Sequence, residues 1–312
     1  MTTSAISVSG LRKAYQDKVV LDGVDFEVRA GTVFSLLGPN GAGKTTTVNV
    51  LTTLLRADGG TVRVAGHDIA TDAKAVRAAI GVTGQFAAVD ELLTGRENLQ
   101  LMADLNRKVA GNGERVVAQL LERFELTASA DKPASTYSGG MRRKLDLAMT
   151  LVGDPQIIFL DEPTTGLDPR SRRTMWSIVR DLVADGVTVF LTTQYLEEAD
   201  QLADRVAVLD RGRLVAQGTP DELKRLIPGT HVRLRFTTAA ELDAAAVVFP
   251  EATRDDEALA LRVPADGGTK SLRALLDRLD EHSLSAEECS VHTPDLDDVF
   301  LALTGHTTEA AK

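Results

Sequence analysis

Nine consecutive residues, GPNGAGKTT from Gly38 to Thr46, have the residue types and spacing of a loop that holds phosphate groups. The glycines let the backbone curl so that successive N–H groups face inward, and the helix expected to follow adds the positive end of its dipole. Lys44 would reach the β- and γ-phosphates as a point charge, and the Thr45 hydroxyl would coordinate Mg²⁺. The motif therefore predicts a site for the phosphates of a nucleotide and for Mg²⁺, formed by Gly38, Asn40, Gly41, Ala42, Gly43, Lys44, Thr45 and Thr46.

Two adjacent carboxylates, Asp161 and Glu162, end the apolar run IIFLDE and form the second candidate group. Asp161 would lie at the carboxyl end of a buried strand, where open α/β sheets place their ligand crevice, and it could face Mg²⁺ directly or through water. Glu162 could then polarise a water in line with the γ-phosphate, which makes it the candidate general base. Without the phosphate loop upstream, the better interpretation of an Asp-Glu pair would be a solvated turn.

A third candidate group consists of the tripeptide Ser138-Gly139-Gly140 and, further along, Asp168. Because the tripeptide precedes a helical pattern, Ser138 is predicted to be the N-cap of a helix whose exposed N–H groups accept an anion. Taken alone, the same tripeptide is more often a plain loop. Asp168, in PTTGLDP, is predicted to lie in a tight turn beyond the strand that ends at Asp161.

These groups need a scaffold, and the apolar pattern around them predicts a mostly parallel sheet flanked by helices. Residues 31–37 are typical of a short buried strand before the phosphate loop. After the loop, four apolar residues recur at helical spacing, namely Val48, Leu51, Leu54 and Leu55. Further strands are expected at residues 156–161, 187–192 and 205–209, with a helix over 171–185.

Three further parts of the fold are expected beside this core, namely a β-subdomain, a helical insert and a C-terminal domain. Alternating apolar and polar residues over 6–28 and 59–66 predict an antiparallel β-subdomain, and residues of about 86–151 have the spacing of a helical insert. After Pro220 the composition changes, and residues 226–312 are expected to form a small α+β accessory domain. The predicted fold is therefore an α/β P-loop NTPase core over residues 4–225 with a second, smaller domain.

The composition argues against several functions. A net charge of −10 argues against a main role on nucleic acid, which requires an excess of Lys and Arg on one face. The apolar runs fall far short of the roughly 20 residues that span a bilayer, and no apolar leader is evident near Met1, so we expect a soluble chain. The single cysteine, Cys289, excludes an internal disulfide, and the five histidines lack the spacing of metal ligands.

Taken in order, the motifs resemble those of the ATP-binding cassette (ABC) family over about residues 4–225. In this resemblance GPNGAGKTT is the Walker A motif, YSGGM a variant signature motif, IIFLDE the Walker B motif, and GLD the loop that follows it. Tyr15 matches the aromatic residue on which the family stacks adenine, although a tyrosine on a half-buried strand face would look the same. Gln85 matches the glutamine that ties the Mg²⁺ site to the helical insert.

The segment LTTQYLEEAD departs from the family pattern, because Gln194 stands where most members have a histidine that touches the γ-phosphate. An amide can donate a hydrogen bond but cannot become cationic near neutral pH. Gln194 is therefore expected to orient the phosphate rather than stabilise charge, and basal hydrolysis is expected to be slow. This glutamine and the closing TPDLDDVFLALTG resemble the subgroup of daunorubicin and related antibiotic-resistance ATPases.

The resemblance also implies partners, because family members enclose ATP between the Walker A loop of one cassette and the signature segment of another. This chain has one copy of each, which implies a head-to-tail homodimer with Lys44 of one copy opposite Ser138 of the other. A separate transmembrane permease, received by the helical insert, would hold the chain at the cytoplasmic face of the cell membrane.

The expected function is the ATPase subunit of an exporter for a drug, an antibiotic or another hydrophobic compound. The alternative is a non-transport cassette ATPase that acts in DNA repair or on ribosomes. For the accessory domain, regulation of the ATPase, support of the dimer or permease contact, and simple stabilisation of the fold are all compatible with the sequence.

Overall fold

The computed structural model describes residues 4–84, 88–106, 109, 111–226, 230–265, 268–292 and 295–304. The chain divides into two compact units, Met1–Pro220 and Asp221–Lys312. Each unit has a hydrophobic core of its own, as a domain does. No helix in the described part of the chain has both the length and the apolar character that a membrane crossing requires.

A six-stranded sheet forms the centre of the first unit. Its strands are, in spatial order, β10 (Arg213–Gly218), β9 (Arg205–Asp210), β3 (Val33–Leu37), β8 (Thr188–Thr193), β7 (Ile157–Asp161) and β6 (Ile80–Thr83). All neighbours are parallel except β10 and β9. The central strands β3, β7 and β8 are buried along their whole length, as apolar strands covered on both faces must be. The predicted mostly parallel sheet is confirmed, but β6 and the helix before it, α2 (Ala73–Ala79), were not predicted from the sequence.

A second sheet in this unit is antiparallel, as predicted. Its strands follow the order β2 (Lys18–Arg29), β1 (Ser4–Tyr15), β4 (Gly59–Val64) and β5 (His67–Asp68). In the register of the sheet, Val8 lies opposite both Phe26 and Val62. These three side chains are buried, because alternate residues of each strand face the core.

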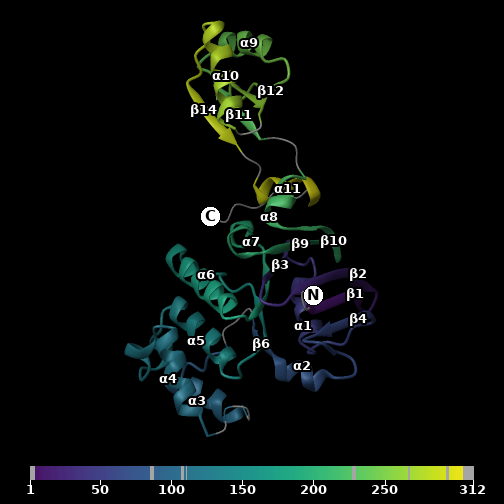
Figure 1. Cartoon of the computed structure of the whole chain (residues 1–312), viewed down its shortest axis with the longest axis vertical. Coiled ribbons are helices and arrows are strands. Elements are labelled where there is room, and N and C mark those ends of the chain that lie inside the picture. Colours follow the sequence, from purple (N-terminus) through teal and green to yellow (C-terminus); the bar gives the residue numbers. More distant parts are fainter. Residues whose placement is uncertain are drawn as a thin grey trace. The chain divides into compact units, whose positions relative to one another are not determined.

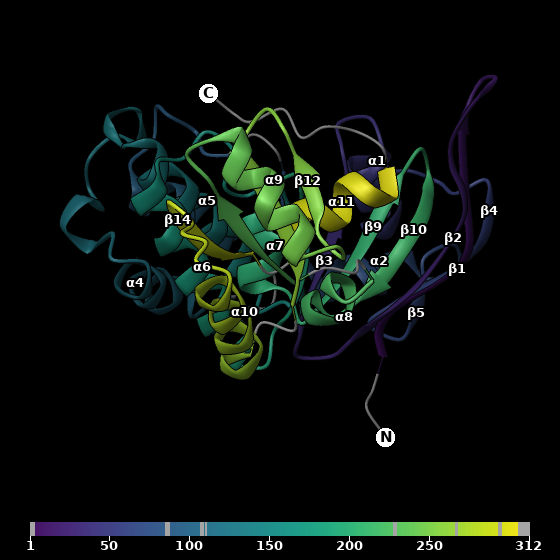
Figure 2. The same ribbon diagram turned by 90° about the horizontal axis from the view of Figure 1, so that it is seen from above.

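The helices of this unit fall into separate groups. The phosphate loop leads into α1 (Lys44–Leu51), which ends earlier than the apolar spacing predicted, since Leu54 lies beyond the helix and is 72% exposed. The helical insert consists of α3 (Gly95–Leu105), α4 (Gly113–Arg123) and α5 (Gly139–Leu151), with short 3₁₀ turns at Thr127–Ser129 and Ala134–Thr136. Two more helices, α6 (Pro169–Ala184) and α7 (Leu196–Leu202), connect the later strands. In both Figure 1 and Figure 2, α4 and α5 lie on one side of this unit and β1, β2 and β4 on the other.

Residues of the central strands pack alternately into two hydrophobic clusters. Ile158 of β7 packs with α6 and the helical insert, whereas the next residue, Phe159, packs with α1 and the antiparallel sheet. On that second face, Phe34 stacks on Phe190 with ring centroids 5.5 Å apart and on Phe26 with centroids 5.2 Å apart. Packing on both faces fixes the strands, and therefore fixes the turns at their carboxyl ends.

The second unit is an antiparallel sheet with helices, as the predicted α+β class requires. The sheet has the order β12 (Thr253–Asp255), β13 (Ala260–Pro264), β11 (His231–Arg235) and β14 (Glu288–His292). Its helices are α8 (Pro220–Lys224), which begins at the boundary of the units, α9 (Ala239–Val248), α10 (Thr269–Glu281) and α11 (Leu296–Thr304). The sequence pattern did not indicate α9, β12 or β14. Asp295 caps the start of α11, because its carboxylate accepts a hydrogen bond from the N–H of Asp298 at 2.9 Å.

Candidate functional site

The carboxyl ends of three neighbouring strands bring the main candidate residues to one edge of the central sheet. The last residue of β3 lies opposite the last residue of β8, and Asp161 at the end of β7 lies opposite Thr192 of β8. The phosphate loop follows β3, Gln194 follows β8 and Glu162 follows β7. Parallel pairing therefore joins three segments that are far apart in the sequence.

The backbone of the phosphate loop requires glycine for two different reasons. Gly41 and Gly43 have positive φ angles of 80° and 113°, which L-residues rarely adopt. At Gly38 the reason is close approach, because a Cβ atom there would collide with the carbonyl oxygen of Leu209. The loop residues differ in exposure: Asn40, Gly41 and Thr45 are exposed, Thr46 is half-buried, and Gly38, Ala42, Gly43 and Lys44 are buried.

Lys44 lies at the start of α1 and folds back over the loop. Its ammonium donates to the carbonyl oxygens of Gly38 at 2.8 Å and Pro39 at 3.2 Å, and it lies 3.3 Å from the Glu162 carboxylate. Burial lowers the pKa of Lys44, while the nearby Glu162 carboxylate raises it. The loop therefore holds a desolvated cation whose compensating anion is the candidate general base.

One threonine of β8 binds the carboxylate of Asp161 and the backbone of Glu162. The Thr192 hydroxyl donates to Asp161 Oδ1, and the N–H of Glu162 donates to the Thr192 carbonyl oxygen at 3.1 Å. Glu162 itself adopts a left-handed φ of 48°. Such a conformation costs a non-glycine residue roughly 1–3 kcal/mol and recurs at functional sites. It places the Glu162 carboxylate beside Lys44 while Asp161 stays in the strand.

Two of the other predicted ligands, Gln194 and Tyr15, lie at the ends of strands. Gln194 is half-buried in the bend after β8. Tyr15 ends β1 and is 47% exposed, and the Lys13 ammonium lies 5.6 Å from its ring centroid. Gln85 lies outside the residues that the structure describes.

The predicted helix cap at Ser138 is confirmed. The Ser138 hydroxyl accepts a hydrogen bond from the N–H of Met141 at 3.2 Å, at the start of α5. A Cβ atom on Gly140 would lie only 2.6 Å from the hydroxyl oxygen of Ser171 in α6, whereas a Cβ atom on Gly139 would make an ordinary contact. The helix that begins at Ser138 therefore packs tightly against the start of α6.

Asp168 is the N-cap of α6, which the sequence analysis did not predict. Its carboxylate accepts hydrogen bonds from the N–H groups of Arg170 and Ser171, both at 3.0 Å, and from the Ser171 hydroxyl at 2.6 Å. These bonds, above all the one from the Ser171 hydroxyl, lower the pKa of Asp168. A shallow pocket of about 230 Å³ lies beside the two helix starts and is lined by residues that include Ser138, Gly140, Lys144, Arg170 and Ser171. Arg170 and Lys144 bring positive charge to this pocket, but Glu125 also lines it and forms an ion pair with Lys144 at 2.8 Å.

Two buried polar residues, one at the edge of the sheet and one in α7, were missed in the sequence. Thr192 is one of several threonines at strand ends, and nothing in its spacing marks it as a bridge between Asp161 and Glu162. Glu198 is fully buried in α7, where it accepts a hydrogen bond from Trp176 Nε1 at 3.1 Å, and burial raises its pKa. A signal for Glu198 does exist, because it precedes the buried Leu202 by one helical turn and so lies on the apolar face.

Comparison with known proteins identifies the family. The sequence pattern of the ABC transporter family matches residues 21–165. The daunorubicin resistance ATP-binding protein DrrA3 of Streptomyces coeruleorubidus is 49% identical over 98% of this chain and 97% of its own length. The doxorubicin resistance ATP-binding protein DrrA of Mycobacterium tuberculosis is 43% identical over 98% of this chain and 95% of its own. The Nod factor export ATP-binding protein I of Ralstonia nicotianae is 39% identical over 97% of this chain and 95% of its own length.

Solved structures agree with these relatives. An ATP-binding cassette of an ABC transporter in its ADP conformation is 28% identical to this chain, with a TM-score of 0.64. The match covers 71% of this chain and 93% of that cassette. A nucleotide-free cassette is 27% identical, with a TM-score of 0.65, and the match covers 72% of this chain and 94% of that cassette. The relatives give no support to the alternative of an ATPase in DNA repair or on ribosomes. With a relative 49% identical along nearly its whole length, this chain belongs to the ABC transporter family and is one of its ATP-hydrolysing, ATP-binding subunits.

Proposed function

We propose that this chain powers an exporter that moves a drug, an antibiotic or another hydrophobic compound through a separate permease. The observation that carries the proposal is the meeting of Lys44, Asp161 and Glu162 at one sheet edge, with Lys44 and Glu162 only 3.3 Å apart. The relatives named for daunorubicin and doxorubicin resistance and for Nod factor export support export of such a compound.

The residues divide the work of hydrolysis among them. Loop N–H groups and Lys44 bind the phosphates, Tyr15 stacks on the adenine, and Gln194 orients the γ-phosphate. Glu162 accepts a proton from the attacking water. Thr45 and Asp161, with Gln85, offer the hard oxygen ligands that Mg²⁺ prefers, and the ion would neutralise charge on the phosphates.

The contact between Lys44 and Glu162 bears on the order of events. Both side chains are almost completely buried, so neither charge is well solvated by water. A triphosphate in the loop would compete with Glu162 for the Lys44 ammonium, since phosphate oxygens bind lysine strongly. Phosphate binding would thereby free the Glu162 carboxylate to accept a proton from water. The base is then available only when its substrate is present.

The ATP-binding subunits of this family dimerise and work with a membrane permease. For this chain we propose a head-to-tail homodimer that holds two ATP molecules, each between Lys44 of one copy and Ser138 of the other. Hydrolysis would replace the bridging triphosphate by products that leave, and the interface would open. We also propose that the permease holds the dimer at the cytoplasmic face of the cell membrane.

Trapping the ATP-bound state tests the dimer. Glu162→Gln removes the proton acceptor but keeps the size of the side chain, so ATP should bind, stay intact and hold two copies together. Size-exclusion chromatography with ATP should then show a dimer, and turnover should fall by about 100-fold or more. Glu197→Gln, which changes an exposed glutamate of α7, is the matched control and should behave as the wild type. A Glu162→Gln protein that stays monomeric with ATP would contradict the proposal.

The transport part needs a separate test with the permease. Cells that express this chain together with its permease should tolerate more daunorubicin than cells that express Lys44→Ala with the same permease. Equal sensitivity of the two strains would reject daunorubicin as the cargo. The ATPase and dimer measurements do not depend on that result.

A further inference from the structure

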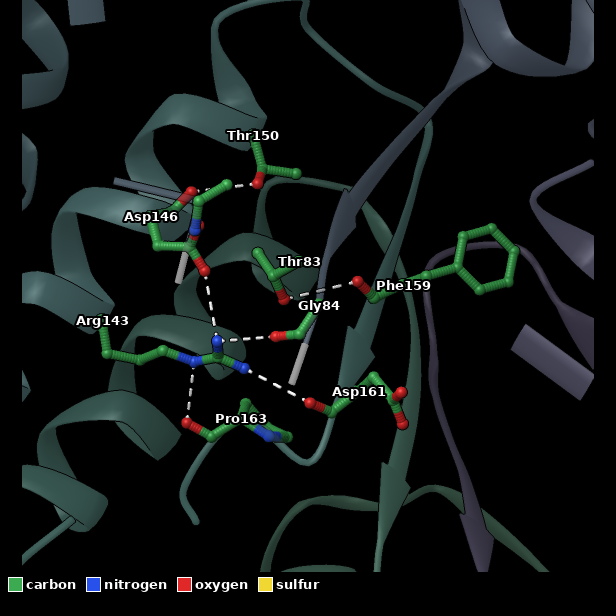
Figure 3. A network of polar contacts seen from close by, with 9 residues as sticks. Thr83, Gly84, Arg143, Asp146, Thr150, Phe159, Asp161 and Pro163 are labelled. Atoms are coloured by element: carbon green, nitrogen blue, oxygen red, sulfur yellow. Dashed lines mark hydrogen bonds and ion pairs between the residues drawn. The ribbon is translucent and has the colours of Figure 1, made fainter. Parts of the chain in front are cut away.

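A single buried arginine connects α5, the helix that begins within the signature motif, to the turn after β7 (Figure 3). Arg143 is 7% exposed, and its guanidinium donates to the carbonyl oxygens of Gly84 at 2.9 Å, Pro163 at 2.9 Å and Asp161 at 3.4 Å. The same group contacts the carboxylate of Asp146, one turn later in the helix, at 3.1 Å. One side chain of α5 therefore binds the backbone of two other segments.

The first of these segments carries the candidate base. Asp161 and Pro163 are the residues immediately before and after Glu162, and both of their carbonyl oxygens accept hydrogen bonds from Arg143. Glu162 has the left-handed φ of 48°, so its position depends on how the two flanking peptide groups are held. A shift of α5 would move the guanidinium and, through it, this turn.

The second segment is the chain that flanks residues 85–87. Gly84 is held by Arg143, and the N–H of Ala88 donates to Asp146 Oδ1 at 2.9 Å. The ion pair of Arg143 and Asp146 thus holds the backbone on both sides of this stretch. Arg143 and Asp146 belong to the same rigid helix. The turn after β7 and the backbone that flanks residues 85–87 must therefore both follow any movement of α5.

The energetics of the pair suggest more than stabilisation. Burial lowers the pKa of Arg143 and raises the pKa of Asp146, so each charge loses hydration on folding. A buried ion pair is often no more stabilising than a neutral pair of similar size. What an apolar pair would lack is a planar set of donors that reaches three carbonyl groups at once.

We propose that Arg143 is a positioning residue that couples the two ATP sites of the dimer. The inference rests on the proposed dimer, in which α5 of one copy caps the nucleotide of its partner through Ser138. Closure of α5 on the partner's nucleotide moves Arg143, and Arg143 then sets the Asp161–Pro163 turn of its own copy. Nucleotide capture at one site thereby prepares the base at the other.

The test compares variants in their ATP dependence. Arg143→Gln alone leaves Asp146 as an uncompensated buried charge, so the main variant is the double change Arg143→Gln with Asp146→Asn, which removes both charges. Arg143→Lys keeps the charge but not the planar set of donors. Arg142→Gln is the matched control, because Arg142 is the neighbouring residue of the same helix and forms an ion pair with Glu91 at 2.6 Å. Each variant is characterised by thermal unfolding, fluorescent-nucleotide binding and turnover over a range of ATP concentrations.

In the wild type and in Arg142→Gln we expect a Hill coefficient clearly greater than about 1 and no greater than about 2, set by two coupled sites. The double variant should bind nucleotide with unchanged affinity, lose cooperativity and show kcat reduced by roughly 10- to 100-fold, because the base is misplaced. Arg143→Lys should recover part of the kcat. Wild-type cooperativity and kcat in the double variant would overturn the proposal, as would a non-cooperative wild type.

The dimer assay separates this result from a failure of the proposed function. If Glu162→Gln forms an ATP-dependent dimer and the double variant remains cooperative, the coupling role of Arg143 is wrong and the proposed function stands. If Glu162→Gln does not dimerise, the proposed function itself fails.

Discussion

At the scale of single residues, the site depends on groups whose charge is costly to bury. Lys44 is stabilised by two carbonyl oxygens and by Glu162 rather than by water. Removing one partner of such a contact leaves the other uncompensated, which costs more than the pair contributes. Changes at this cluster are therefore expected to affect both stability and catalysis, whereas changes at its edge, such as at Gln194, test catalysis alone.

The glutamine at position 194 is predicted to keep basal hydrolysis slow. Gln194→His would place a side chain that can become cationic after β8, near the expected γ-phosphate, and added positive charge there stabilises the transition state. We expect kcat to rise by about tenfold and its pH profile to gain a step near pH 6.5, with faster turnover on the acidic side. Steady-state ATPase rates across the pH range would show this. The same rate and the same profile in both proteins would refute the role given to Gln194.

A second prediction at this scale concerns Glu198 and the pH dependence of stability. Because burial raises its pKa in the folded state, the folded protein binds this proton more tightly than the unfolded chain does. The stabilisation from the protonated form is therefore complete below the unfolded pKa, and it is lost as the pH rises through the folded pKa. Glu198→Gln cannot lose a proton and should escape this loss.

We expect the free energy of unfolding of Glu198→Gln, relative to that of the wild type, to increase as the pH rises. Urea denaturation between about pH 5 and pH 9 measures the difference. Glu197→Gln provides the matched control, since Glu197 is exposed and adjacent. A constant difference between Glu198→Gln and the wild type over this range would show that Glu198 does not titrate as proposed.

At the scale of elements, the sequence was most informative where one physical cause dominates. The central strands were predictable because a parallel sheet covered on both faces requires nearly continuous apolar runs, as in IIFLD. The strand β6 was missed because its four residues include Gly81 and Thr83, which weaken the apolar signal. The helix α9 was missed because its many alanines leave no distinct polar and apolar faces.

The candidate site was predictable to a similar extent. Motif spacing led to the phosphate loop and to the Asp161–Glu162 pair, and the residue type of Ser138 led to its role as a cap. Arg143 and Thr192 could not be found in this way. A lone arginine or threonine carries no periodic signal, and both matter only because the fold brings distant backbone groups beside them.

The contact between α5 and α6 gives a prediction at the same scale. Gly140→Ala would force a methyl group against Ser171, whose hydroxyl cannot easily move because it is bonded to Asp168 at 2.6 Å. Overpacking of this kind should destabilise the first unit by about 1–3 kcal/mol. Gly139→Ala, with room for its methyl group, is the control and should be neutral or slightly stabilising. Urea denaturation measures the stability of both variants. Equal free energies of unfolding for Gly140→Ala and Gly139→Ala would contradict a tight contact between α5 and α6.

At the scale of the whole molecule, the central expectation is that one chain forms only half of each ATP site. The exposed Asn40 in the phosphate loop and Ser138 at the start of α5 offer positions for a crosslink between copies. The natural Cys289 is exposed and must first be changed to serine. In that background, and with Glu162→Gln to preserve ATP, Asn40→Cys and Ser138→Cys are made in separate chains.

Mixing the two single-cysteine chains should give a crosslinked dimer with a short bismaleimide, and only when ATP is present. Neither chain alone should give comparable dimer, because identical positions lie far apart in a head-to-tail arrangement. The result is measured on a denaturing gel, with the Cys289→Ser chain as the background. If a chain carrying both cysteines instead closes within itself in an ATP-dependent way and mixed chains do not crosslink, each copy completes its own site. Opening of an interface could then no longer drive the permease, because hydrolysis would break no bridge between copies.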